Sequence, residues 1–446
     1  MSSATSPVSE ERRKASLKVI WAGTLGTTLE FYDLLVYASV AAIVFNQLFF
    51  PETSPAAGTL LSLSTFAIGY FARPVGAAVF GHLGDRIGRR QTLMVTMVLM
   101  GAATVLVGLL PTYDQIGILA PILLITLRIV QGAAVGGEWG GAVLLIGEHA
   151  GTENRGRSTS FAQLGSPGGL LLANGVVALT VALLSPEEFL AWGWRIPFLL
   201  SAVLFLIGLY IRFKVEETPV FQELKKETAI AGSPVVETFS KNWKRLLIAI
   251  GVTMVSFAGY GVFTTVGLAY LSLQEIPSSW GLIGTVVGAA LALPTVVIVG
   301  RMSDRLGRKP FYWASAVIMT AWAFAFFPLL NTQNAGLIIL AVAFGIVAWS
   351  VLYGVQGAYL PELFPARVRY TGASLAYQVA GAIGGLVPAL AISLMNSFGG
   401  STLAIVALVV LGFVLSAIAL AVGPETGYSR RAERQAPASR LAGAEE

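Results

Sequence analysis

The chain has 446 residues, of which 55% are hydrophobic and only 12% are charged, so it lacks the polar residues that would cover a soluble protein of this length. The absence of cysteine excludes disulfides, iron–sulfur clusters and cysteine metal sites. A net charge of +5 could indicate nucleic-acid binding, but the distribution of the basic residues along the chain favours membrane topology instead.

Twelve apolar runs follow one another along the chain, and each is close to the ~20 residues that a helix needs to cross a bilayer. Strands of a membrane barrel would alternate apolar and polar residues, and these runs are continuously apolar, so helices are predicted. The predicted spans are 19–45, 58–81, 92–111, 118–147, 158–184, 194–211, 246–273, 280–299, 311–330, 335–360, 371–395 and 402–422.

All but three of the 29 basic residues fall in the two termini or in the loops after the even-numbered helices. The three exceptions are Arg73 and Arg128, inside predicted helices, and Arg195, near a short loop on the other side. The positive-inside rule then places both termini in the cytoplasm. The predicted organisation is a cytoplasmic N-terminus (1–18), a six-helix half (19–213), a polar linker (214–245), a second six-helix half (246–422) and a cytoplasmic C-tail (423–446).

An internal repeat supports this division into halves. The stretch "GHLGDRIGRR" (81–90) follows the second helix of the first half, and "GRMSDRLGRK" (300–309) follows the second helix of the second half. A further repeat, offset by 214 residues, pairs Glu148, Arg155 and Ser160 with Glu362, Arg369 and Ser374. Two parallel six-helix halves are a known plan of transporters.

The repeated motif resembles the signature of the major facilitator superfamily. Within it, the chain resembles the bacterial metabolite:proton symporter family. The stretches that carry the resemblance, in order along most of the chain, are "GTTLEFYDLLVY" (26–37), "FARPVGAAVFGHLGDRIGRR" (71–90), "LRIVQGAAVGGEWGGA" (127–142), "WGWRIPFL" (192–199), "EETPVFQEL" (216–224) and "PELFPARVRYTGASLAYQ" (361–378).

The repeated charges are expected to act at helix N-termini, which carry a partial positive charge. Asp85 is expected beside the start of helix 11, near Thr371, and Asp304 beside the start of helix 5, near Ser158. Arg89 and Arg308 are then expected to bridge to Glu362 and Glu148, with Arg369 and Arg155 completing the two clusters. The resemblance implies that such clusters latch the halves together on the cytoplasmic face; the alternative is that these charges only enforce topology.

Charged residues at membrane depth are candidates for function. Helix 1 carries Glu30, Asp33 and Tyr37 on one stripe, and helix 4 carries Arg128, Gln131 and Glu138 on one face. One arginine against three acids would leave a net charge of −2 in a low-dielectric setting, so at least one acid is expected to be protonated in part of the cycle. The proton-coupling candidates are Asp33, the preferred one, followed by Glu30 and Glu138.

Arg128 offers a bidentate fork for a carboxylate, so a substrate carboxylate could compete for it and release a helix-1 acid to bind a proton. The alternatives are a fixed ion pair for Arg128 and a packing role for Glu138 within "GGEWGG". Arg73 is interpreted as structural, near the cytoplasmic end of helix 2, and His82 and His149 as loop residues. The remaining substrate-binding candidates are Tyr37, Gln131, Gln163, Asn174, Tyr260, Tyr353, Gln356, Tyr377 and Gln378.

The sequence therefore predicts an all-α integral membrane protein with twelve helices in two pseudo-symmetric halves. As the resemblance implies, it is expected in the bacterial inner membrane as a monomer that imports a small organic acid or zwitterion with protons: a dicarboxylate, tricarboxylate, shikimate-like acid, betaine or proline. A proton-driven exporter of amphipathic compounds and, less readily, a transporter-like sensor are the alternatives. No enzymatic nucleophile–base pair, cofactor motif, metal cluster or nucleic-acid partner is expected.

Overall fold

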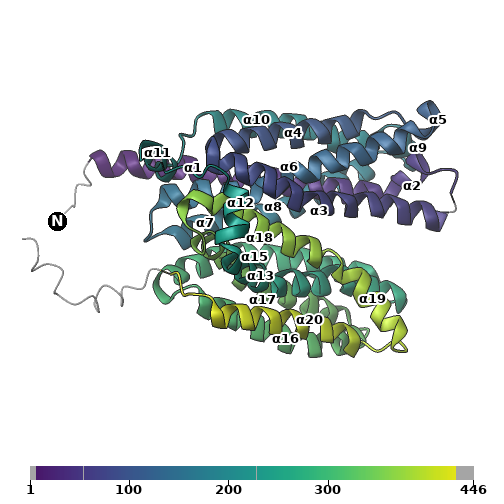
Figure 1. Cartoon of the computed structure of the whole chain (residues 1–446). Coiled ribbons are helices and arrows are strands. Elements are labelled where there is room, and N and C mark those ends of the chain that lie inside the picture. The colour runs from purple at the N-terminus through teal and green to yellow at the C-terminus, as the bar shows by residue number, and fades with distance from the viewer. Residues whose placement is uncertain (1–6, 54, 228, 428–446) are drawn as a thin grey trace, which may run out of the picture.

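The computed structural model describes residues 7–53, 55–227 and 229–427, which form helices joined by short turns (Figure 1). The predicted C-tail, 423–446, is therefore described only up to residue 427. The first half contains α1 (Pro7–Val40), η1 (Ala41–Phe45), α2 (Asn46–Phe49), α3 (Pro55–Arg86), α4 (Arg89–Leu109), α5 (Tyr113–Ile116), α6 (Leu119–Ala150), α7 (Arg155–Gln163), α8 (Gly165–Leu183), α9 (Pro186–Ala191), η2 (Gly193–Arg195) and α10 (Ile196–Phe213).

Two short helices, α11 (Pro219–Lys226) and α12 (Pro234–Lys241), lie in the connection between the halves. The second half contains α13 (Trp243–Gly261), η3 (Val262–Val266), α14 (Gly267–Leu273), α15 (Ser278–Leu306), α16 (Lys309–Leu330), α17 (Ala335–Glu362), η4 (Ala366–Val368), α18 (Arg369–Gly384), α19 (Val387–Ser397) and α20 (Leu403–Val422).

The predicted membrane spans correspond to these helices. Within the described residues ten helical stretches are long and apolar enough to cross a membrane, and Lys18–Val40 with Ile43–Phe49, which meet at a bend of 42°, form an eleventh. The 32-residue α3 occupies the position of the remaining predicted span, 58–81. The protein is an all-α membrane protein of twelve spans in two six-helix halves, which Figure 1 shows as an upper and a lower bundle.

The two halves share their irregularities as well as their order. The first span of each half contains a π-helical segment, Ala41–Phe45 and Val262–Val266. The fifth span of each half is interrupted, between α7 and α8 and between α18 and α19. Such interruptions inside helices are common at functional sites. Their recurrence at equivalent places extends the sequence repeat to the backbone.

The sequence placed the repeated charged motifs in loops, but in the structure they begin within helices. Asp85 and Asp304 lie in the last turns of α3 and α15, which continue past the predicted spans to Arg86 and Leu306. The chain then turns at a glycine with positive φ in each half, Gly88 at 118° and Gly307 at 94°, before the next helix begins. Glycine adopts this backbone region without the steric penalty that other residues carry.

Helix pairs approach closely where glycines face one another. In the first half α3 packs along α6, and a Cβ built on Gly76 would lie 1.8 Å from the carbonyl oxygen of Ala133. The halves meet through α3 with α18 and through α15 with α7. Small residues at such contacts let membrane helices pack backbone to backbone.

Gly76→Ala should therefore lower the stability of the protein by about 1–3 kcal/mol, because the added methyl group meets backbone that cannot rotate away. Gly175→Ala in α8 is the matched control, since nothing lies within 4 Å of its added Cβ. Thermal unfolding of both purified variants in one detergent is the measurement. Equal unfolding temperatures would show that α3 and α6 can separate without loss.

Candidate functional site

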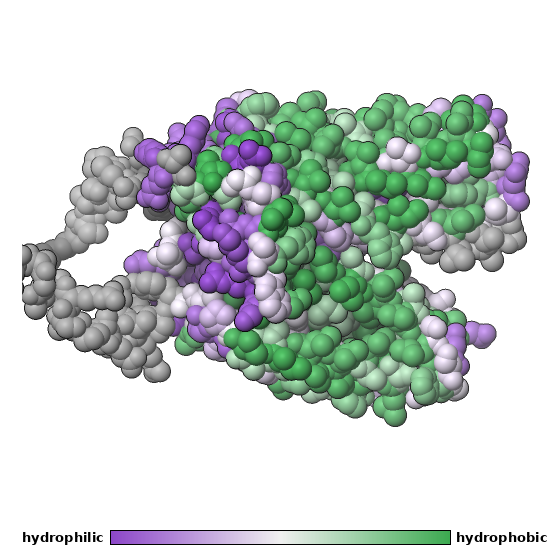
Figure 2. All heavy atoms as spheres, in the orientation of Figure 1, coloured by the Kyte–Doolittle hydropathy of each residue, from purple (hydrophilic) through white to green (hydrophobic). Residues whose placement is uncertain are grey.

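The two halves are tied together at the end of the bundle that carries α11 and α12, here called the charged end (Figure 2). Asp85 of α3 accepts hydrogen bonds from the backbone N–H groups of Tyr370 and Thr371, at 3.2 and 2.9 Å, and from the Thr371 hydroxyl at 2.8 Å. These residues form the first turn of α18 in the other half. A carboxylate there also interacts favourably with the positive end of the helix dipole.

Asp304 repeats this arrangement from the second half. It accepts hydrogen bonds from the backbone N–H groups of Gly156 and Arg157, at 2.7 and 2.8 Å, in the first turn of α7. The sequence placed it near Ser158, one residue further along the same turn. Each half therefore caps a helix of its partner.

The arginine–glutamate partners differ from those expected. Arg89 lies 3.5 Å from Glu148 and Arg308 lies 3.2 Å from Glu362, so each arginine pairs within its own half. The expectation that Arg89 reaches Glu362 and Arg308 reaches Glu148 was wrong. The reason is that α4 packs against α6 and α16 against α17, which brings the end of each longer helix beside the start of its neighbour.

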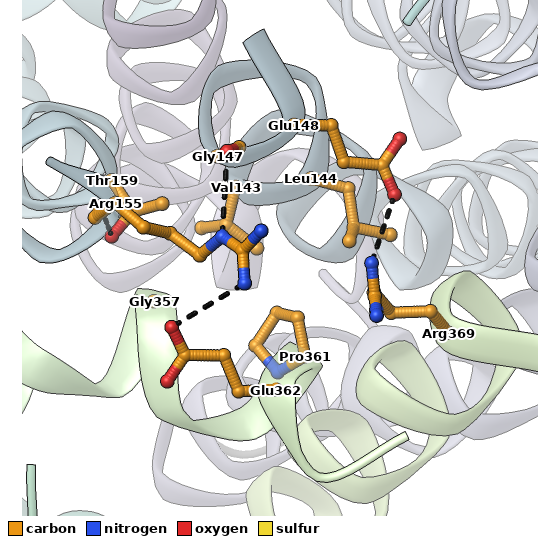
Figure 3. A pocket seen from close by; sticks show the side chains of 10 residues that line it. All are labelled: Val143, Leu144, Gly147, Glu148, Arg155, Thr159, Gly357, Pro361, Glu362 and Arg369. Atoms are coloured by element: carbon orange, nitrogen blue, oxygen red, sulfur yellow. Dashed lines mark hydrogen bonds and ion pairs between the residues drawn. The ribbon is translucent and has the colours of Figure 1, made fainter. Parts of the chain in front are cut away.

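The bridges across the seam come from the other two arginines (Figure 3). Arg369 lies 3.6 Å from Glu148, and Arg155 lies 3.6 Å from Glu362. Each glutamate thus holds one arginine from each half. Burial alone would lower the pKa of Arg308, but Glu362 and Asp304 raise it above its ordinary value, so this buried guanidinium stays charged.

The halves separate at the opposite end of the bundle, here called the open end. Figure 2 shows a hollow between them there. Between the charged end and the open end lies a group of buried ionisable residues. Its acids are Glu30, Asp33 and Glu138, and its bases are Arg73, Arg128 and Arg212. The sequence counted one arginine against three acids, and that inventory was wrong: Arg73 and Arg212 are also buried, at 7% and 2% exposure.

Glu138 is fully engaged. Arg212 of α10 forms an ion pair with one of its oxygens, and the Thr96 hydroxyl donates to the other at 2.7 Å. Arg212 also donates to the backbone oxygen of Leu93 at 3.0 Å. It passes close over α1, where a Cβ on Gly26 would lie 1.9 Å from its Nη2 atom.

Asp33 is also held by donors. The Thr104 hydroxyl of α4 donates to it at 3.0 Å and the Ser201 hydroxyl of α10 at 2.5 Å. The Gln131 amide donates to Thr104 at 2.7 Å and accepts from Arg128, which links Asp33 to Arg128 through two side chains. Asp33 therefore lies between α1, α4 and α10, among helices of its own half.

Arg128 stacks on an aromatic ring of α1. Its guanidinium carbon lies 3.8 Å from the centre of the Tyr37 ring, and the Tyr37 hydroxyl bonds to Thr65 at 2.5 Å. A Cβ on Gly69 would approach its Nη2 atom to 2.8 Å, so glycine makes room for it. This cation–π contact orients the guanidinium without neutralising it.

Glu30 differs from the other two acids. It is buried, its Oε2 accepts no hydrogen bond from the described residues, and it forms no ion pair with them. Arg73 and Arg212 lie within electrostatic range of it, as do Tyr353 and Tyr377 of the second half. Arg73, whose guanidinium carbon lies 3.8 Å above the Tyr70 ring, has a buried Nε that donates to no acceptor among the described residues.

Aromatic side chains join the halves beside Glu30. Trp139 of α6 stacks on Tyr377 of α18, with ring centres 3.9 Å apart. Gln163 accepts from the Trp139 indole at 2.9 Å and donates to the backbone oxygen of Tyr353 at 2.9 Å. Tyr353 stacks on Trp349 at 4.2 Å. These rings could hold a cationic or planar group, and the nearby arginines could hold an anionic one.

The other predicted binding residues lie in different surroundings. Tyr260 packs on Trp349 at 4.5 Å. Gln356 and Gln378 are buried, and each keeps one amide atom without a partner among the described residues. Asn174, by contrast, is exposed and accepts from Ser39 at 3.3 Å, whereas Gln163 is buried. The sequence predicted one continuous span, 158–184, for this stretch, whereas the structure divides it into α7 and α8.

No group of three His, Cys, Asp or Glu side chains suited to a metal occurs within the described residues. His82 and His149, interpreted from the sequence as loop residues, lie in α3 and in the last turn of α6. The His149 Nδ1 atom lies 2.8 Å from the Leu145 backbone oxygen. Both are thus part of helix ends.

Two six-helix halves that meet at one end, part at the other and enclose charged and aromatic side chains define a membrane transporter. The sequence model of the Major Facilitator Superfamily matches residues 24–389. The chain is 40% identical over 413 residues to the inner membrane metabolite transport protein YhjE of Escherichia coli strain K12, covering 90% of this chain and 93% of that protein. It is 39% identical over 399 residues to the shikimate transporter of the same strain, covering 88% and 91%.

Among solved structures, the proton:xylose symporter XylE bound to 6-bromo-6-deoxy-D-glucose superimposes with a TM-score of 0.76 at 18% identity, covering 94% of this chain and 98% of XylE. This chain belongs to the Major Facilitator Superfamily. It is a multi-pass membrane transporter and not an enzyme.

Proposed function

We propose that this protein is a proton-coupled symporter that imports a small organic acid, or a zwitterion that carries a carboxylate, across the bacterial inner membrane. The charged end, with both termini, faces the cytoplasm, in line with the basic residues gathered there. The state described is then outward-open: the cytoplasmic side is closed and the hollow faces outward.

The observation that carries the proposal is the charge balance of the buried group. Three arginines and three carboxylates are neutral together when all are ionised. A bound substrate anion adds one negative charge in a low-dielectric chamber, which is costly unless it is compensated. A proton on Glu30, whose Oε2 accepts no hydrogen bond from the described residues, would cancel that charge. An anionic substrate and a proton therefore bind together.

Arg73 and Arg128 are the residues that would hold the substrate carboxylate. Both guanidinium groups stack on tyrosine rings, and both come from the half that holds Glu30. Arginine binds planar carboxylates through two parallel donors. The 39% identical relative is a transporter of shikimate, which is itself a carboxylate.

The clusters at the charged end act as a cytoplasmic gate, made of Asp85, Arg89, Glu148 and Arg369 on one side and Asp304, Arg308, Glu362 and Arg155 on the other. Opening to the cytoplasm separates α3 from α18 and α15 from α7, which breaks both helix caps and both cross-seam bridges. The gate thus stabilises the outward-open state until substrate and proton are bound.

Uptake by proteoliposomes that contain the purified protein tests this function. Labelled dicarboxylates, tricarboxylates, shikimate, betaine and proline are offered with and without an inward proton gradient. We expect the gradient to stimulate uptake of one of these compounds and a protonophore to abolish the stimulation. If none of them enters while preloaded hydrophobic cations leave, the protein is an exporter and the symport proposal fails.

A further inference from the structure

The five residues that follow the last helix, Gly423–Gly427, are bound to the charged end of the second half. The Glu425 carboxylate accepts hydrogen bonds from the backbone N–H groups of Arg308, at 2.7 Å, and Lys309, at 3.0 Å. These N–H groups open α16, where the helix has no internal acceptors for them. Glu425 therefore caps α16 directly beside the gate arginine Arg308.

Thr426 contacts the gate itself. Its hydroxyl donates to Oε2 of Glu362 at 2.6 Å. Glu362 is the carboxylate that holds Arg308 of its own half and Arg155 of the other half. The Thr426 hydroxyl is thus a third donor on the glutamate that bridges the seam.

Two further contacts hold the backbone of this segment in place. The Tyr359 hydroxyl donates to the Pro424 carbonyl at 3.0 Å, and the Lys309 ammonium donates to the Gly423 carbonyl at 2.9 Å. The segment is therefore anchored to α16 and α17, the two helices whose ends supply Arg308 and Glu362. The position of the segment therefore depends on how α16 and α17 pack, as the contact between Arg308 and Glu362 does.

The first half contains a Glu–Thr pair equivalent to Glu425 and Thr426. Glu217, just after α10, accepts from the backbone N–H groups of Arg89 at 3.0 Å and Arg90 at 3.1 Å, so it caps α4 as Glu425 caps α16. The next residue, Thr218, accepts from the Phe221 N–H at 3.2 Å and begins α11. The Glu–Thr pair is thus repeated after each half, but only Thr426 donates to a gate glutamate.

We propose that the segment Gly423–Gly427 is a component of the cytoplasmic gate, in which Glu425 and Thr426 are positioning residues that hold Arg308 and Glu362 in the closed arrangement. The closed gate is stabilised while this segment is docked and weakened when it leaves. The inference rests on the gate role proposed above, but not on the identity of the substrate or on proton coupling.

The test measures the balance between closed and open gates without substrate. Because the chain has no cysteine, spin labels can be attached at chosen positions. One label pair, Gln91→Cys with Ala314→Cys, reports the charged end from exposed sites on α4 and α16, and a second pair, Leu109→Cys with Thr332→Cys, reports the open end.

In this background Thr426→Val should increase the ratio of open to closed gates about tenfold, because it removes a hydrogen bond to a charged group. The distance at the charged end should lengthen while that at the open end shortens. Thr426→Ser keeps the hydroxyl and should restore the parent distribution. Thr218→Val removes the equivalent hydroxyl of the first half and should leave the distribution unchanged.

Asp85→Asn separates the failure of this inference from that of the gate. If Asp85→Asn opens the charged end while Thr426→Val matches the parent, the gate stands and Gly423–Gly427 is not part of it. If neither variant changes either distance, the gate role fails and this inference fails with it. A loss of folding common to Thr426→Val and Thr426→Ser would mean a purely structural role, which also contradicts the proposal.

Discussion

Glu30→Gln should abolish accumulation of substrate driven by a proton gradient while exchange of labelled for unlabelled substrate continues. Glutamine resembles the protonated acid, so the loaded carrier keeps its charge balance and still crosses. The empty carrier would retain one uncompensated positive charge, because no proton can leave residue 30. Since such a buried charge costs several kcal/mol, gradient-driven uptake should fall by about 100-fold or more. Both rates can be measured in the same proteoliposomes.

Asp33→Asn is the matched control for this prediction. Asp33 is equally buried, but Ser201 and Thr104 both donate to it, which stabilises the carboxylate in place. Its replacement also removes one negative charge from the buried group, so we expect less folded protein and slower uptake. A residual gradient dependence should nevertheless remain, because Glu30 can still exchange its proton. If Asp33→Asn loses the gradient dependence and Glu30→Gln keeps it, Asp33 carries the proton, as the sequence alone suggested.

The sequence predicted the number and order of the spans because an apolar run long enough to cross a bilayer has few other structures open to it. It also placed Asp85 and Asp304 at helix starts of the opposite half, because the motif repeats and helix N-termini attract acids. The sequence could not predict which arginines pair with Glu148 and Glu362. Whether Arg89 meets Glu148 or Glu362 depends on which helix packs beside α4, and no local pattern records that choice.

Depth in the membrane was the other quantity that the sequence misjudged. Arg73 was placed near a helix end, but α3 continues for 13 residues beyond it to Arg86, about 20 Å at the rise of a helix. Arg212 was counted among the cytoplasmic loop charges because the sixth span was predicted to end at residue 211. Its side chain points back toward the start of its helix, as helical side chains do, and so enters the protein. Gly26 of α1, which makes room for the Arg212 guanidinium, is the one sequence feature that could have indicated that this side chain is buried.

Arg212→Leu alone should destabilise the protein by about 3–5 kcal/mol, because it leaves the Glu138 carboxylate buried with the Thr96 hydroxyl as its only donor among the described residues. Replacing both partners, Arg212→Leu with Glu138→Leu, removes the unpaired charge and should recover most of that loss. Thermal unfolding of the two single variants and the double variant in one detergent gives the interaction energy of the pair. Additive losses in the double variant would show that the two side chains stabilise the fold independently.

The same double variant decides whether Glu138 is a proton carrier. Glu30 stays in place in it, and the buried charges still balance, since one acid and one base have been removed together. Gradient-driven uptake by the double variant would therefore exclude Glu138 from coupling and leave Glu30 and Asp33, which the Glu30→Gln and Asp33→Asn variants distinguish. If the double variant folds and exchanges substrate but no longer responds to the gradient, Glu138 carries the proton and Arg212 is the partner from which Glu138 is released.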